Sequence, residues 1–248
     1  MAIDLKKVAS VAPGLTKQAE ASKLSLEKVN LNDHTARVVL VLDVSGSMEG
    51  LYSSGKVNEL VKRVLPVGLG FDDDGEIDVY AFGSNAKSIG GYGLSNYRQC
   101  VSDVLAKTSW SGTRYETALK LIDDKYGNSA QPVYVIFVTD GDTENKEGAA
   151  ELVRKMSSKP VFLQFVGLGE SVTPQTKKKT GFFAGLSRAM SSFTFLEKLD
   201  DLPGRVVDNA NFFAIKDPTS LSDAEFYDLL MGEYPEWLKA AKAKGILR

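Results

Sequence analysis

The chain has 248 residues, of which 43% are hydrophobic and 25% charged, the composition of an ordinary globular protein. Its 30 basic and 32 acidic side chains leave a formal net charge of −2, so we expect no broad electrostatic attraction to nucleic acid or to an anionic membrane. A single cysteine, Cys100, excludes an internal disulfide framework and suits a reducing compartment. We expect its thiol to be a small buried apolar group.

The first residues carry charges where a signal peptide needs an apolar stretch, in Asp4-Leu5-Lys6-Lys7. No apolar run approaches the length of a membrane span. We therefore expect a cytoplasmic protein without a membrane-spanning segment. Residues 1–36 contain one possible strand, Leu24–Val29, and the single histidine, His34, is expected to be a loop residue in the polar turn that follows it.

Four apolar runs further along the chain predict strands, and helical patterns lie between them. Three of these runs are almost uninterrupted, which is typical of strands buried on both faces of a parallel sheet. They are Val38–Leu42, Val133–Val138 and Val161–Val166. The fourth, Ile77–Phe82, alternates more and is expected to lie nearer an edge. Apolar residues three and four apart predict helices over 57–65, 118–122 and 149–156, and a last helix over 237–244 that Gly245 ends.

This alternation predicts an α/β fold, a doubly wound and mostly parallel sheet with helices on both faces. Residues 37–216 would form this domain. The N-terminal extension, 1–36, and the C-terminal helical extension, 217–248, are too short to be domains, so each is expected to pack on the core.

Three segments rich in side-chain oxygen are placed by this fold at one edge of the sheet. They are Asp43-Val44-Ser45-Gly46-Ser47 after one buried strand, Ser111-Gly112-Thr113 before a helix, and Thr139-Asp140-Gly141-Asp142 after another buried strand. Ligands bind beyond the carboxyl ends of the strands in open α/β sheets. Carboxylate and hydroxyl oxygens suit a hard cation such as Mg²⁺, and Gly46 is expected to permit a tight turn between the two serines.

Each segment also has a simpler interpretation as a set of helix or turn caps. Thr113 with Glu116 fits a capping box, which is compatible with a second role of its hydroxyl. Asp140 could cap a turn, and Asp142 or Thr143 could cap the helix that follows. The conjunction of all three segments at one edge favours a metal site.

Two clusters of like charge are expected to have no binding role. The acidic stretch 72–78 has neither the glycine nor the glutamate that an EF-hand loop starting at Asp72 requires, so we expect a polar turn leading into a strand. The basic run 177–179 is short, and we expect a solvated surface segment.

The oxygen-rich segments resemble the metal-ion-dependent adhesion site (MIDAS) of von Willebrand factor A (vWA) domains. The resemblance implies that Ser45 and Ser47 ligate the ion directly, and that Asp43, Thr113 and Asp140 ligate it directly or through water. A narrower similarity covers nearly the whole chain. Leu24–Val29, residues 71–79 and residues 233–238 resemble segments of bacterial tellurium-resistance vWA proteins of the TerF type, which implies a role in tellurite resistance, general stress resistance or phage defence.

The leading hypothesis for function is therefore a protein-binding module rather than an enzyme. It would hold Mg²⁺, with Mn²⁺ or Ca²⁺ possible, and bind a partner protein that supplies an exposed Asp or Glu. One alternative is a metal-dependent hydrolase, for example a phosphatase with Asp43 as nucleophile, and another is a structural vWA scaffold in which the metal is incidental. A phosphatase of the Asp-x-Asp kind needs a second carboxylate where this chain has Ser45, and no lysine or histidine is obviously placed as an acid or base. The oligomeric state is left open.

Overall fold

The computed structural model describes residues 3–72, 75–169 and 193–247. Over these residues the chain forms a six-stranded sheet with the order β3-β2-β1-β4-β5-β6. Strand β3 is antiparallel to β2, and all other neighbours are parallel. The strands are β1 (Arg37–Asp43), β2 (Ile77–Phe82), β3 (Ala86–Tyr92), β4 (Val133–Thr139), β5 (Val161–Leu168) and β6 (Ala210–Ile215).

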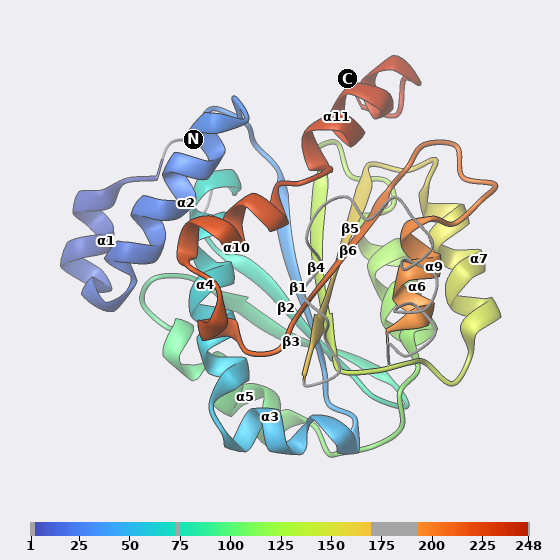
Figure 1. The fold of residues 1–248 in the computed structure, drawn as a ribbon, viewed down its shortest axis with the longest axis horizontal. Coiled ribbons are helices and arrows are strands. Elements are labelled where there is room, and N and C mark those ends of the chain that lie inside the picture. Colours follow the sequence, from blue (N-terminus) through green and yellow to red (C-terminus); the bar gives the residue numbers. More distant parts are fainter. Residues whose placement is uncertain (1–2, 73–74, 170–192, 248) are drawn as a thin grey trace, which may run out of the picture.

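The predicted α/β fold is confirmed, with helices on both faces of the sheet (Figure 1). Alternate residues of each central strand face opposite cores, so that Leu40 packs in one core and Val41 in the other. One face is covered by α1 (Leu5–Val11), α2 (Thr16–Lys28), α4 (Lys56–Phe71), α5 (Cys100–Lys107), α10 (Asp223–Leu230) and α11 (Tyr234–Ala243). The other is covered by α6 (Tyr115–Tyr126), α7 (Lys146–Met156) and α9 (Thr194–Asp200). The short helix α3 (Glu49–Ser53) lies below the edge where β1 ends.

The three buried strands lie where the sequence predicts them, with β1 and β4 at the centre of the sheet and β5 one position inside β6. Strand β2 is one position inside the edge, because β3, which the sequence pattern did not reveal, covers its outer side. Strand β6 was also missed. It forms the other edge of the sheet over the described residues.

The predicted strand at Leu24–Val29 is wrong, because these residues belong to α2 or directly follow it. Apolar and polar side chains alternate at Leu24, Ser25 and Leu26, but the buried positions of the helix follow a helical spacing. Leu24 is 59% exposed, whereas Ser25 and Leu26 face α4 and α10. Packing against two other helices thus outweighs a short alternating pattern.

Helices near both ends of the chain contact the rest of the structure. Ser25 Oγ donates a hydrogen bond to Asp228 Oδ1 (2.8 Å), which ties α2 to α10. Tyr234 and Trp237 of α11 stack on each other and contact Phe162 of β5. The boundaries at residues 36 and 216 stay predictions.

Three local predictions meet different outcomes. Cys100 is fully buried, as expected, and burial raises the pKa of its thiol to about 12. His34 lies in a loop but is half-buried, with Nε2 2.9 Å from the Tyr234 hydroxyl. The stretch that begins at Asp72 leads into β2, as expected, and the Gly75 amide donates to the Asp72 carbonyl (3.3 Å), while the Asp72 side chain is buried and pairs with Arg37 (3.3 Å). The basic run 177–179 lies outside the described residues.

Among the described residues, no helix combines the length and the apolar character needed to cross a membrane.

Candidate metal centre

Asp43 is the last residue of β1 and lies at the base of the predicted site, fully buried. Its Oδ1 accepts a hydrogen bond from the Ser45 amide (2.6 Å), and its Oδ2 accepts one from Thr139 Oγ1 (2.6 Å). Burial raises the pKa of Asp43 to about 6, although these hydrogen bonds oppose the rise; the nearby charge of Asp140 adds a smaller increase. The carboxylate is therefore a buried negative charge without a cationic partner among the described residues.

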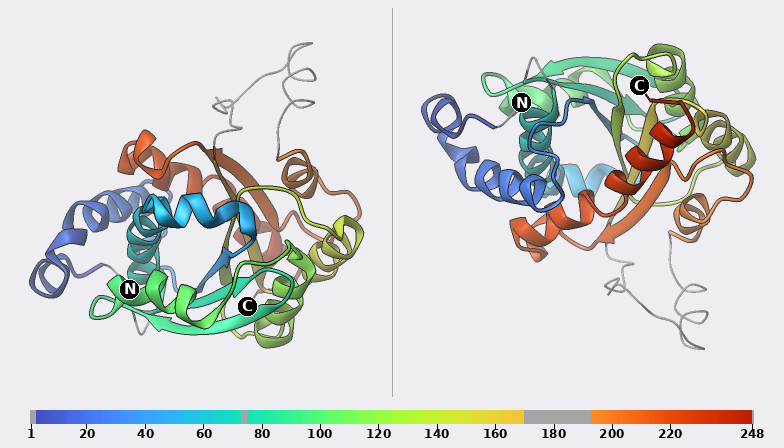
Figure 2. Two further views of the ribbon diagram at one scale, coloured as in Figure 1. Left: turned by 90° about the horizontal axis from the view of Figure 1, so that it is seen from below. Right: turned by 90° about the horizontal axis from the view of Figure 1, so that it is seen from above.

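Ser45, Ser47 and Asp140 lie next to Asp43 because β1 and β4 are parallel neighbours and end at the same edge. Ser45 Oγ is 3.2 Å from Ser47 Oγ, and Ser47 Oγ donates a hydrogen bond to Asp140 Oδ1 (2.9 Å). Burial is the main reason that the pKa of Asp140 is raised as well. Four of the five predicted ligands are thus joined by one chain of contacts that includes Asp43. Figure 2 (left) looks onto this edge of the sheet.

Three loops carry the predicted ligands: the first follows β1, the second precedes α6 and the third follows β4. The fifth predicted ligand, Thr113, lies in the second loop, which is hydrogen-bonded to the first and the third. At its start, Ser111 pairs with the first loop: the Ser111 amide donates to the Val44 carbonyl (3.3 Å), and the Gly46 amide donates to the Ser111 carbonyl (3.1 Å). At its end, the Thr113 amide donates to Glu144 Oε1 (3.1 Å) and its carbonyl accepts from the Glu144 amide (2.8 Å). Thr113 is half-buried, and these bonds use only its backbone, so they leave its hydroxyl for a further ligand.

The capping roles that the sequence allowed are not the ones observed. Helix α6 begins at Tyr115, and Thr113 does not cap it. Thr143 Oγ1 accepts from the Tyr115 amide instead (3.0 Å), which joins the third loop to the second. Helix α7 is capped by Asn145 and by neither Asp142 nor Thr143. The oxygen-rich loops therefore hold one another in place through bonds between segments distant in the sequence.

The expectation for Gly46 is wrong as well. Gly46 does not adopt a positive φ, and a Cβ atom built on it would meet nothing within 4 Å. The close approach occurs at Gly112, where a Cβ would come within 2.1 Å of Glu144 Oε1. A side chain at Gly112 would therefore displace the Glu144 carboxylate from its hydrogen bond with the Thr113 amide.

The sequence did not point to the residues that support the predicted ligands. Thr139 precedes Asp140 and donates a hydrogen bond to the Asp43 carboxylate. The buried Tyr115 hydroxyl lies 3.2 Å from Thr139 Oγ1 and donates a hydrogen bond to the Gly141 carbonyl. Tyr52 donates to the backbone carbonyl of Asp43 (3.0 Å). The Thr139-Asp140-Gly141 motif was a visible signal for Thr139, whereas Tyr115 and Tyr52 could be found only from their contacts.

This set of groups fits a hard divalent cation. It offers two carboxylates and three hydroxyls, which are ligands typical of Mg²⁺. Within the described ranges, no group of three or more His, Cys, Asp or Glu side chains is placed to hold a metal ion, so a cation at this site would also need its hydroxyls. A cation here would compensate the buried charge of Asp43, for which the described residues offer no cationic partner.

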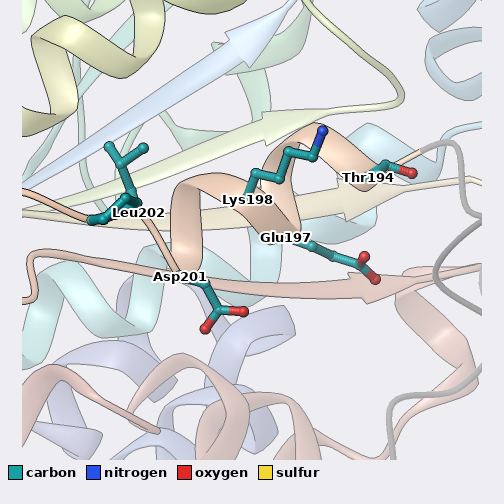
Figure 3. Close-up of a pocket in the computed structure, with 6 residues that line it drawn as sticks. Thr194, Glu197, Lys198, Asp201 and Leu202 are labelled. Atoms are coloured by element: carbon teal, nitrogen blue, oxygen red, sulfur yellow. The ribbon is translucent and has the colours of Figure 1, made fainter. Parts of the chain in front are cut away.

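A separate pocket of about 410 Å³ lies on α9 and the turn that follows it (Figure 3). Thr194, Glu197, Lys198, Asp201, Leu202 and Pro203 line it. Figure 3 shows the labelled charged side chains pointing in different directions rather than toward a common centre. None of the five predicted ligands lines this pocket, so it is not part of the metal centre.

Comparison with known proteins agrees with this architecture. A family model described as the vWA found in the TerF C terminus matches residues 35–247. YcbR, an uncharacterised protein of Bacillus subtilis (strain 168), is 38% identical over 240 residues, which cover 93% of this chain and 89% of that protein.

Solved structures share the fold at low sequence identity. Proximal thread matrix protein 1 from the mussel byssus, solved with a zinc-occupied MIDAS motif, aligns with a TM-score of 0.52 and 12% identity over 80% of this chain. This chain spans only 47% of that protein. An aerotolerance-related membrane protein from Bacteroides fragilis aligns with a TM-score of 0.51 and 14% identity over 81% of this chain and 99% of that one. On the match over residues 35–247, the chain belongs to the TerF-like family of von Willebrand factor A domains.

Proposed function

We propose that this chain is a metal-ion-dependent protein-binding module. Asp43, Ser45, Ser47, Thr113 and Asp140 would hold one Mg²⁺ ion, with Mn²⁺ or Ca²⁺ as alternatives. The observation that carries this proposal is the buried and uncompensated carboxylate of Asp43 beneath a group of hydroxyls. The zinc-occupied MIDAS of the mussel protein supports the same kind of site in a related fold.

The proposed ion would keep at least one coordination position open, because Mg²⁺ takes six ligands in a near-octahedral arrangement and the five groups supply at most one each. A carboxylate from a partner protein would complete it, and a charge-assisted contact of this kind is strong when water is excluded. We therefore propose a partner that presents an exposed Asp or Glu to this edge of the sheet. Breaking one such contact at the centre of an interface commonly costs about 2–5 kcal/mol.

The geometry does not favour the hydrolase alternative. A nucleophilic aspartate must reach the substrate, but Asp43 is fully buried and both of its carboxylate oxygens accept hydrogen bonds. The single histidine, His34, contacts Tyr234 at the opposite end of β1. Lys146, beside the third loop, pairs with Asp142.

The finer assignments rest on the family and on composition. Membership of the TerF-like family supports a role in tellurite or general stress resistance, with phage defence as another possible setting. The single cysteine supports a cytoplasmic location.

The test combines metal titration with capture of partners. Calorimetry and thermal melting with Mg²⁺, Mn²⁺ and Ca²⁺ at millimolar concentrations should show binding and a raised Tm, because a ligand that binds the native state stabilises it. Capture from a lysate of the native host should retain a partner in Mg²⁺ and lose it in EDTA or with Asp43→Ala.

Absence of any heat and any thermal shift with all three ions would refute the metal centre. A complex that persists unchanged in EDTA would refute the binding mode. Turnover of a phosphate ester that is lost in Asp43→Ala would establish the hydrolase instead.

A further inference from the structure

Trp110 lies at the same edge of the sheet as the metal centre and is 37% exposed. The large apolar side chains that are exposed in the described part of the chain are Val11, Leu24, Leu105, Trp110 and Val206. Trp110 is the aromatic one among them, and the second tryptophan, Trp237, is only 2% exposed. Single exposed apolar residues are common on protein surfaces, so the position of Trp110 matters more than its exposure.

The indole of Trp110 is held against the loops that carry the predicted ligands. The next residue, Ser111, bonds through its backbone to both Val44 and Gly46, the neighbours of Ser45. The indole packs edge-to-face on the ring of Tyr52, with the ring centroids 5.3 Å apart. Tyr52 in turn donates its hydroxyl hydrogen to the Asp43 carbonyl. The indole is therefore held by Tyr52, which also supports Asp43, and 37% of the Trp110 residue stays exposed.

A rigid and partly exposed tryptophan is the kind of side chain that contributes most to protein interfaces. Its contact with Tyr52 fixes its orientation, so little side-chain entropy is lost when a ligand covers it. Beside it lies a site that, with its ion bound, would attract a carboxylate. The two features are different in chemistry and adjacent in space, so a ligand that satisfies both needs an acid and an apolar group close together.

We infer that Trp110 and the metal centre form one docking surface for a segment of a partner protein. The segment carries an Asp or Glu that completes the ion and, one or two residues away, an apolar side chain that packs on the indole of Trp110. This inference rests on the proposed function, the binding of a partner carboxylate, and adds to it an apolar contact between the partner and Trp110. A free small carboxylate would satisfy the ion alone and gain nothing from Trp110.

The test uses two peptides that differ only in the apolar group. Acetyl-Gly-Asp-Leu-Gly-amide and acetyl-Gly-Asp-Ser-Gly-amide are titrated in Mg²⁺ into the wild-type chain, Trp110→Ala and the control Leu24→Ala. Leu24 is exposed on α2, which lies on the outside of the helical layer and away from α3 (Figure 1). The wild-type chain should prefer the leucine peptide on the order of five-fold, the value expected when an apolar side chain is partly removed from water. Trp110→Ala should lose this preference, and Leu24→Ala should keep it.

Two further measurements accompany the titration. The affinity for Mg²⁺ alone should be the same in Trp110→Ala as in the wild type, which shows that the metal centre is intact. The emission of Trp110 should shift to shorter wavelength when the leucine peptide covers the indole, while the buried Trp237 contributes a constant background.

The outcomes separate this inference from the proposed function. If both peptides bind equally and only in Mg²⁺, or if Trp110→Ala retains the preference, the inference is overturned and the metal-dependent module stands. If the chain binds Mg²⁺ but neither peptide, or does not bind Mg²⁺, the proposed function fails and the inference fails with it. Concentration-dependent dimers that Trp110→Ala abolishes in sedimentation experiments would identify a second copy of the chain as the occupant and overturn the choice of a separate partner.

Discussion

Replacing Asp43 by asparagine should stabilise the metal-free protein while removing its response to metal. The change keeps the shape of the side chain and removes a charge that is fully buried. Asparagine can still accept the hydrogen bond from the Ser45 amide, and its amide group can donate to Thr139 Oγ1. Thr139 then donates to the Gly141 carbonyl, which is 3.4 Å away. No buried group needs to lose its partner.

The magnitude follows from the pKa of Asp43, which burial raises from 3.8 to about 6. A rise of this size penalises the ionised form by about 3 kcal/mol. Because the folded pKa is raised, the stability that this group contributes is fully present below the unfolded value of 3.8 and is lost as the pH rises through about 6. Above that pH, Asp43→Asn should therefore exceed the wild type in free energy of unfolding by up to about 3 kcal/mol, and the difference should fall to about 1 kcal/mol near pH 4.5.

The assay is urea denaturation in EDTA between pH 4.5 and pH 8, repeated at pH 7.5 with Mg²⁺. Asp33→Asn, a change at an exposed aspartate in the turn before β1, is the matched control and should leave the free energy of unfolding nearly unchanged. Magnesium should stabilise the wild type and the control but not Asp43→Asn. Equal or lower stability of Asp43→Asn at pH 7.5 in EDTA, or a difference that does not depend on pH, would refute the view that Asp43 is an uncompensated buried charge.

Three further predictions concern the ligands, their support and the opposite end of the sheet. Ser47→Ala should weaken Mg²⁺ binding in calorimetry and change the free energy of unfolding by no more than about 0.5 kcal/mol, because Ser47 is exposed; unchanged affinity would remove Ser47 from the ligand set. Thr139→Val should weaken Mg²⁺ binding about ten-fold, since it removes the donor that orients Asp43, whereas Thr139→Ser should restore it; equal affinities of the two variants would show that the hydroxyl has no positioning role. Burial of Asp123 favours a raised pKa, but hydrogen bonds from Lys155 and Lys159 outweigh burial and hold the pKa below 3.8. The stability that the ionised Asp123 contributes is therefore present above pH 3.8 and is lost as the pH falls below it. Asp123→Asn should thus lower the free energy of unfolding by about 2 kcal/mol at pH 7, measured in urea, and a difference that does not shrink on acidification would contradict this explanation.

Part of this protein could be predicted from local patterns. The apolar runs of β1, β4 and β5 predict strands buried on both faces, because they are short and rich in β-branched and aromatic residues. Asp43 ends β1, and Asp140 directly follows β4. Because these two strands are parallel neighbours, the two carboxylates lie at the same edge of the sheet. The class of fold and the neighbourhood of four candidate ligands therefore follow from the sequence.

Tertiary structure alone decided the rest. Leu24–Val29 has the alternation of a strand, but contacts with α4 and α10 make it helical. Thr113 looks like a helix cap, yet its backbone is held by Glu144, 31 residues away, and its hydroxyl is left for another role. Thr139 reaches Asp43 across 96 residues, and Tyr115 and Trp110 take their positions from rings contributed by other elements. Such contacts leave no periodic trace in the sequence, because they depend on where the folded chain places distant side chains and on the cost of leaving a buried polar group without a partner.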